Sequence, residues 1–252
     1  MQSIDINCDM GESYGHFKIG NDEAILPYIS SCNIACGFHG GDPFHIAQTI
    51  KKAIAHKVRI GAHPAYPDLA GFGRRKMQIP TIELTAIIKY QVAALKGMTE
   101  SIGGRLAYVK PHGALYNTAA SDVKESTTII EAVLAIDDSL AIMGLAGSVT
   151  QKVAEAMNVP FIAEAFSDRT YTKDGRLQSR LQAGAVIQEP TRSAAQVLSI
   201  IQKQQVLSHT GTIVPIVAQS ICIHGDNPAA VAILQAIDLL LTQNGINKSR
   251  VV

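Results

Sequence analysis

The chain has 252 residues, with 22 basic and 21 acidic side chains and a formal net charge of +1. That balance gives no electrostatic basis for binding nucleic acid or a membrane surface, and no apolar run is long enough to span a bilayer. The first residues lack the basic and apolar regions of a secretory signal, and the four cysteines form no pair of C-x-x-C motifs. We therefore expect a cytoplasmic protein that folds as one domain over residues 1–252.

Short β-like runs alternate with helical segments along the chain. The sequence predicts strands at Ile4–Asp9, Ile29–Ala35, Val58–Ala62, Leu106–Val109, Leu140–Met143, Val159–Ala163, Ile213–Val217 and Ser220–Ile223. It predicts helices at Pro43–His56, Thr81–Ile102, Ser121–Ile136, Ser148–Met157, Thr191–Gln205 and Ala229–Gln243. Thr81 has the side chain of an N-cap, and Ser121 is expected to open its helix. This alternation is typical of βαβ units and an α/β fold with a mainly parallel sheet.

Polar clusters follow most of the predicted strands. About seven βαβ units in this length favour a closed or nearly closed β/α barrel, and an open doubly wound sheet is the alternative. In a barrel, the carboxyl ends of all strands meet at one mouth, where active sites are built. Because the polar clusters follow so many separate strands, we favour the barrel.

Four histidines each follow a separate predicted strand: His39, His63, His112 and His224. Imidazole and carboxylate groups that converge from neighbouring strands can hold zinc or another divalent ion with an open position for water. The smallest such set is Asp9, His39 and His63, in which His112 or Asp42 could replace any member. The alternative is that these histidines orient a substrate or bond to loop backbone.

A second interpretation is hydrolysis by acid–base chemistry without a metal ion. The candidate carboxylates are Asp9, Glu12, Asp42, Asp168 and Asp226. Lys110 could stabilise an oxyanion or bind a substrate carboxylate. Asp42 and Asp226 could instead be N-caps of the helices that follow them.

Arginines in two segments could bind an anionic ligand, because guanidinium groups suit carboxylate and phosphate. Arg74 and Arg75 lie in a Gly-rich segment that could close over a ligand, although a solvated surface pair is the alternative. Arg169 and Arg180 offer a similar opportunity. The sequence contains no P-loop, no dinucleotide-binding fingerprint and no G-x-S-x-G nucleophile motif.

Seven strand-end motifs, in order along nearly the whole chain, resemble those of the LamB/YcsF family. They are DINCDMGE (5–12), NIACGFHGGDP (33–43), GAHPAYPD (61–68), GFGRR (71–75), KPHGALYN (110–117), EAFSDR (164–169) and IHGD (223–226). Gly40 and Ser167 each stand where the family has alanine. The length and unusual chemistry of the motifs make coincidence improbable.

The resemblance implies a seven-stranded, distorted β/α barrel of the glycoside hydrolase/deacetylase type. It also implies ATP-dependent opening of 5-oxo-L-proline to L-glutamate together with 5-oxoprolinase subunits B and C, with ATP used largely on those partners. On this hypothesis the catalytic residues are Asp9, Glu12, His39, His63, Lys110, His112, Asp168 and His224. The substrate-binding residues are Asp42, Arg74, Glu164, Arg169 and Asp226.

Two other functions remain open from the sequence. One is a stand-alone, metal-dependent deacetylase of N-acetyl sugars. The other is a non-catalytic protein that binds substrate for its partners. The sequence leaves the metal ion, if any, and a homo-oligomeric state undetermined.

Overall fold

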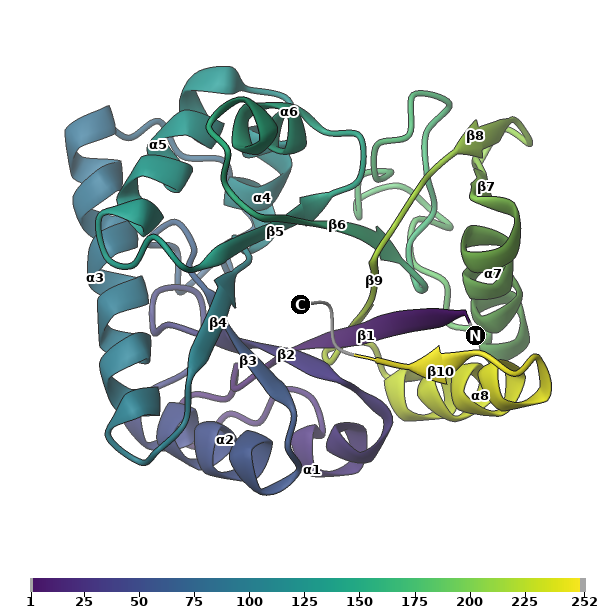
Figure 1. Ribbon diagram of the computed structural model, residues 1–252, viewed down its shortest axis with the longest axis horizontal. Helices are drawn as coiled ribbons and strands as arrows, with labels where there is room; N and C mark the ends of the chain where they lie inside the picture. The colour runs from purple at the N-terminus through teal and green to yellow at the C-terminus, as the bar shows by residue number, and fades with distance from the viewer. Residues whose placement is uncertain (1, 250–252) are drawn as a thin grey trace.

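The computed structural model describes residues 2–249, and within them seven parallel strands close into a barrel (Figure 1). The barrel strands are β1 (Ser3–Met10), β2 (Ser31–Ala35), β3 (Arg59–His63), β4 (Leu106–Val109), β5 (Ala141–Leu145), β6 (Phe161–Phe166) and β9 (Ser220–His224). The barrel closes because β9 pairs in parallel with both β6 and β1. A short strand, β10 (Asn247–Lys248), pairs in parallel with the start of β1.

Helices surround the barrel, as Figure 1 shows in a view along it. They are α1 (Asp22–Ile25), α2 (Pro43–Ala55), α3 (Thr81–Glu100), α4 (Gly113–Ala119), α5 (Val123–Leu134), α6 (Val149–Ala156), α7 (Pro190–Lys203) and α8 (Ala230–Gln243), with a 3₁₀ turn at Leu26–Tyr28. Their apolar faces pack against the outer face of the strands. The predicted seven-stranded β/α barrel is therefore confirmed. Among residues 2–249, no helix is both long and apolar enough to cross a membrane.

The inside of the barrel holds buried polar side chains. Along β1, Ile4, Ile6 and Cys8 belong to the apolar layer between strands and helices. The alternate residues Asp5 and Asn7 are fully buried and bond to side chains of other strands. Successive side chains of a strand point to opposite faces, so the polar residues of β1 point into the barrel.

Gly61 shows how tightly the barrel interior is packed. The ring of Tyr108 lies against this glycine, and a Cβ added there would come within 2.2 Å of the ring atom Cε2. The Tyr108 hydroxyl donates to Asn33 Oδ1 at 2.7 Å. The ring of Tyr108 can therefore pack here only because the residue at position 61 is a glycine, which has no side chain.

The predicted start of a helix at Thr81 is confirmed, but its role as N-cap and the opening of a helix at Ser121 are wrong. Thr81 is the first residue of α3, while Pro80 holds the N-cap position without a side-chain bond. The N-cap of α5 is Asp122, whose side chain accepts from Glu125 N at 3.0 Å, and Ser121 lies outside the helix.

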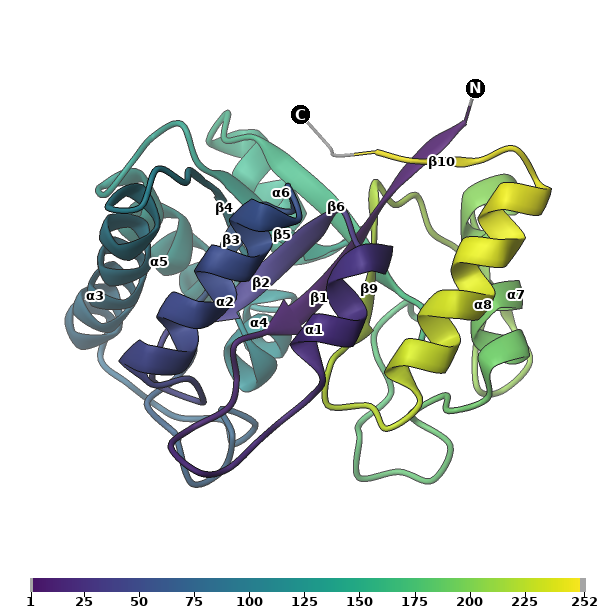
Figure 2. The same cartoon turned by 90° about the horizontal axis from the view of Figure 1, so that it is seen from below.

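The predicted strand at Ile213–Val217 is not part of the barrel. Its first residues form β8 (Ile213–Pro215), which pairs antiparallel with β7 (Gln205–Leu207) in a separate hairpin. Helix α4 was not predicted, because its seven residues are too few for a helical period to stand out. Figure 2 shows the long loops after β1 and β6 at one end of the barrel, opposite β10.

Candidate active site

The carboxyl ends of the strands surround a pocket of about 690 Å³. Its lining combines acid–base groups and cations: Asp9, His63, Arg74, Arg75, Lys76, Lys110, His112, Arg169, Arg180 and His224. These residues come from the ends of β1, β3, β4, β6 and β9 and from the loops that follow them. This end of a β/α barrel is where active sites are built.

Lys110 and Asp9 form the centre of a buried ionic network. Lys110 Nζ lies 3.0 Å from Asp9 Oδ1 and 2.7 Å from Glu164 Oε1. Asn33 also donates to Asp9 Oδ1, at 2.8 Å. Burial alone would raise the pKa of Asp9, but His63 and Lys110 lower it well below its ordinary value. Asp9 is therefore an ionised carboxylate, and the ammonium group of Lys110 donates hydrogen bonds to Asp9 and Glu164 within the protein.

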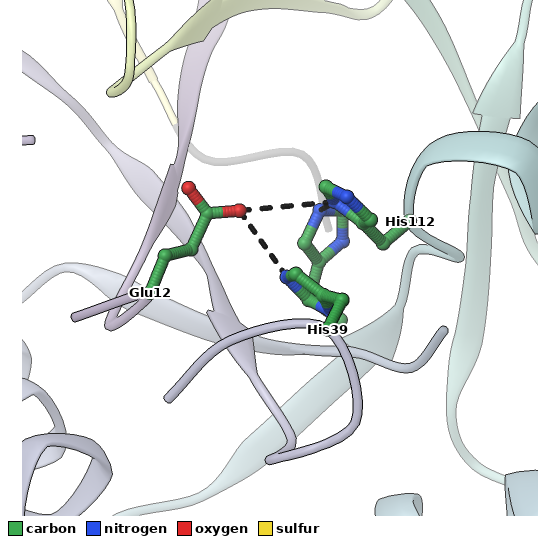
Figure 3. Close-up of side chains that lie close together, drawn as sticks. Glu12, His39 and His112 are labelled. Carbon is green, nitrogen blue, oxygen red and sulfur yellow. Dashed lines mark hydrogen bonds and ion pairs between the residues drawn. The ribbon is translucent and has the colours of Figure 1, made fainter. Parts of the chain in front are cut away.

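Three histidines and one glutamate gather beside this network. Glu12 Oε1 lies 3.2 Å from His39 Nε2 and 3.7 Å from His112 Nδ1 (Figure 3). His63 Nε2 lies 2.9 Å from His112 Nδ1 and 3.3 Å from Asp9 Oδ2. Burial raises the pKa of Glu12 and lowers those of His39 and His112, each well away from its ordinary value.

The segment around Phe72 covers the histidines. The Phe72 ring meets the rings of His39 and His112 edge-on, with centroids 5.4 and 5.3 Å apart. Gly73 has a φ of +64°, and a Cβ there would come within 2.7 Å of His112 Cδ2. The sequence predicted a segment that could close over a ligand, and here it packs directly on the imidazoles.

His224 and Asp168 form a second acid–base pair. His224 Nδ1 lies 2.9 Å from Asp168 Oδ1, and Asn227 donates to Asp168 Oδ2 at 3.2 Å. Burial alone would raise the pKa of Asp168, but His224 and Asn227 hold it below its ordinary value. A carboxylate that accepts from Nδ1–H leaves the other imidazole nitrogen available to the pocket.

Arginines from two loops meet at Asp226 on the pocket rim. Arg74 is paired with Asp226 Oδ2, and Arg180 Nη1 lies 3.6 Å from the same oxygen. Burial alone would raise the pKa of Asp226, but Arg74, His224 and Arg180 lower it. Asp226 is therefore an ion-pair partner rather than a helix cap, and the predicted capping role is wrong because α8 starts without a side-chain cap.

Asp42 caps α2, as one interpretation of the sequence expected. Its side chain accepts from the backbone N of Phe44 and His45. It does not line the pocket, and its part in binding substrate stays a prediction.

Arg169 makes contacts within its own loop. It donates to the backbone oxygens of Gln178 and Ala185, and burial lowers its pKa to about 10. Arg169 thus supports the loop that carries Arg180 on the pocket rim. Its side chain also lines the pocket, where substrate binding stays a prediction.

Sequence reasoning missed several members of the buried network. Asn7 donates to Glu164 Oε1 at 2.9 Å, and Tyr116 donates to Glu164 Oε2 at 2.8 Å. The strict alternation of polar and apolar residues from position 4 to position 9 could have indicated Asn7. Tyr116 lies on α4, which the sequence did not predict.

Comparison with known proteins agrees with this architecture. The chain is 49% identical over 243 residues to a protein of Acinetobacter baylyi that is named as the A subunit of 5-oxoprolinase, covering 96% of each chain. The crystal structure of a lactam utilization protein from Thermus thermophilus has a TM-score of 0.92 at 39% identity, covering 98% of this chain and 99% of that one. A family 4 carbohydrate esterase from Streptomyces lividans shares the fold, with a TM-score of 0.54 at 10% identity over 100% of this chain and 93% of that one. The LamB/YcsF family model matches residues 4–252, and the chain belongs to that family.

Proposed function

We propose that this chain is the A subunit of an ATP-dependent 5-oxoprolinase and opens the lactam ring of 5-oxo-L-proline to give L-glutamate. The observation that carries the proposal is its similarity, over nearly the full length, to relatives that bear the name of this 5-oxoprolinase component. In this proposal subunits B and C are the partners, ATP is used together with them, and the reaction takes place in the cytoplasm.

The rim of the pocket suits an anionic substrate. 5-Oxoproline carries one carboxylate, and a planar guanidinium binds such a group through two parallel hydrogen bonds. Arg180 is held only loosely by Asp226, at 3.6 Å, so its guanidinium can turn toward a substrate. Arg74 on the facing loop shares Asp226 and can add a second cation.

The floor of the pocket supplies acid–base groups for hydrolysis. Asp9, held by Lys110 and Asn33, accepts a proton from the water that attacks the lactam carbonyl carbon. Its low pKa makes it a weak base for free water, so it takes the proton as the water oxygen bonds to the carbon and the water becomes more acidic. His224, oriented by Asp168, gives a proton to the ring nitrogen as the C–N bond breaks. The water oxygen ends in the new carboxylate, and the ring nitrogen becomes the amine of glutamate.

The need for ATP in this reaction has a physical reason. A five-membered lactam is unstrained and conjugated, so its hydrolysis gains little free energy. Transfer of the γ-phosphoryl group of ATP to the lactam oxygen releases ADP and makes the ring carbon a better electrophile. The first water then opens the ring and leaves an acyl phosphate, and a second water hydrolyses that acyl phosphate to release phosphate. Because the sequence lacks a P-loop, the proposal places nucleotide binding largely on the partners.

The test measures glutamate release from 5-oxoproline with the chain alone and with both partners, each with and without ATP. We expect glutamate only when partners and ATP are present. In that complex, Asp9→Asn should lower kcat by about 10²–10⁴-fold, since it removes the general base. Asp122→Asn is the matched control and should keep full activity, because Asp122 lies outside this pocket and asparagine also caps helices.

Other outcomes would contradict the proposal. No glutamate from a complex shown to contain all three proteins would exclude the 5-oxoprolinase reaction. A normal kcat with an altered KM in Asp9→Asn would indicate a chain that only binds substrate. Acetate release from N-acetyl sugars without ATP would indicate a deacetylase.

A further inference from the structure

The tautomers of His63 and His112 are fixed by backbone carbonyl groups. His63 Nδ1 lies 2.7 Å from Lys110 O, and His112 Nε2 lies 2.9 Å from Phe72 O. A carbonyl oxygen only accepts hydrogen bonds, so both of these nitrogens carry a proton. In the neutral rings, His63 Nε2 and His112 Nδ1 therefore carry lone pairs, and Asp9 Oδ2 lies 3.3 Å from the same His63 nitrogen.

These two lone pairs face each other at 2.9 Å. Such an arrangement is repulsive unless a proton or a metal ion lies between or beside the nitrogens. Glu12 Oε1, 3.7 Å from His112 Nδ1, adds a third atom that could bind a metal ion next to these two nitrogens. The ligand atoms of Glu12, His39, His63 and His112 all lie within 4.8 Å of one another.

We propose that Glu12, His63 and His112 bind a divalent transition-metal ion of the zinc class. Ligand–metal distances of about 2.0–2.2 Å place tetrahedral ligand atoms roughly 3.3–3.6 Å apart, a range that lies between the 2.9 Å from His63 to His112 and the 3.7 Å from Glu12 to His112. Two imidazoles and one carboxylate suit zinc and similar ions better than calcium or magnesium. Imidazoles that donate their second N–H to a carbonyl are the usual form of histidine ligands.

His39 is a positioning residue in this proposal. Its Nε2 bonds to Glu12 Oε1 at 3.2 Å, and its ring stacks on that of His112 with centroids 3.7 Å apart. Its Nδ1 is buried without a partner, which fits an Nε2–H donor to Glu12 and a bare lone pair at Nδ1. Hydrogen bonds of this kind orient the carboxylate that binds a metal ion.

The open side of the proposed site faces the pocket. His63 and His112 line the pocket together with Asp9, whereas Glu12 and His39 do not line it. A bound ion there would polarise a water molecule or a carbonyl oxygen. The proposal does not depend on which substrate the pocket binds.

A neighbouring group of possible ligands is a poorer candidate. Asp9, Cys222 and His224 also come within reach of one another. However, Lys110 Nζ already lies 3.0 Å from Asp9 Oδ1 and 3.1 Å from Cys222 Sγ. An ammonium in that position repels a second cation, so the ion belongs with the histidines.

The test titrates metal-stripped protein with Zn²⁺ by calorimetry and with Co²⁺ by visible absorption. We expect one ion to bind per chain. The visible d–d absorption bands should be those of a Co²⁺ ion with a low coordination number. Glu12→Gln and His63→Ala should each weaken binding by more than about 100-fold, and His39→Gln by about 10–100-fold. His45→Ala is the matched control, because His45 also pairs with a carboxylate but lies outside the cluster.

A readout on the unmutated chain keeps the test independent of how the variants fold. With Co²⁺ bound, proton NMR should show two exchangeable, strongly shifted N–H signals, from His63 Nδ1 and His112 Nε2. Absence of Co²⁺ binding, or binding unchanged in His63→Ala, would overturn the proposal. A proton shared by His63 and His112 that persists in excess Zn²⁺ would also overturn it.

Discussion

Single residues inside the barrel are constrained by contacts that cross it. Gly61 faces the ring of Tyr108 with no room for a Cβ, and Tyr108 in turn donates to Asn33. Gly97, on the exposed side of α3, has nothing within 4 Å of an added Cβ. The same substitution should therefore have opposite effects at the two glycines.

Gly61→Ala should lower the free energy of unfolding by about 1–3 kcal/mol, because it overpacks the interior against Tyr108. Gly97→Ala should raise it by about 0.5–1 kcal/mol, because alanine favours the helix. Urea denaturation followed by circular dichroism measures both. Equal effects at the two positions would contradict the close contact at Gly61.

Helices begin where a side chain can satisfy free backbone N–H groups. Asp122 caps α5 through Glu125 N, and Ser148 caps α6 through Gln151 N. Thr81 has the right chemistry for a cap but lies one position inside α3. A cap depends on the extended backbone of the capping residue as well as on its side chain, so residue type alone misplaces it by one position.

Asp122→Ala should lower the free energy of unfolding by about 1 kcal/mol, since it leaves Glu125 N without its acceptor. Thr81→Ala should change it by less than about 0.5 kcal/mol, because Thr81 makes no capping bond. Thermal unfolding of the two variants, compared with the unmutated chain, tests this difference. A larger loss in Thr81→Ala would mean that it is the cap after all.

The whole barrel closes around buried polar groups. Asp5 on β1 accepts from Ser31 on β2, at 2.7 Å, and from Ser220 on β9. Burial raises the pKa of Asp5 despite these donors. The folded state thus binds a proton on Asp5 more readily than the unfolded chain does, and its stability falls as pH rises from the unfolded pKa through the folded one.

That residues 1–252 form one domain stays a prediction.

Asp5→Asn should remove this pH dependence. The free energy of unfolding of the variant, relative to the unmutated chain, should therefore increase as pH rises from about 4 to 7. Chemical denaturation across that range measures the difference. The exposed Asp174→Asn is the control for loss of a charge, and an identical pH profile in both variants would contradict the role of Asp5.

The sequence by itself determined the alternation of strands and helices and the set of strand-end residues, whereas the seven-stranded barrel was implied by the family resemblance. The alternation and the strand-end residues both follow from local patterns, because alternating strands and helices form parallel sheets whose carboxyl ends meet. Only the tertiary structure decided the partners of those residues. It placed Glu12 beside His39 and His112, and Asp9 beside His63 and Lys110. It also gave Asp42 and Arg169 their helix and loop contacts. Such pairings depend on distances between loops far apart in the chain, and no local pattern of residues encodes those distances.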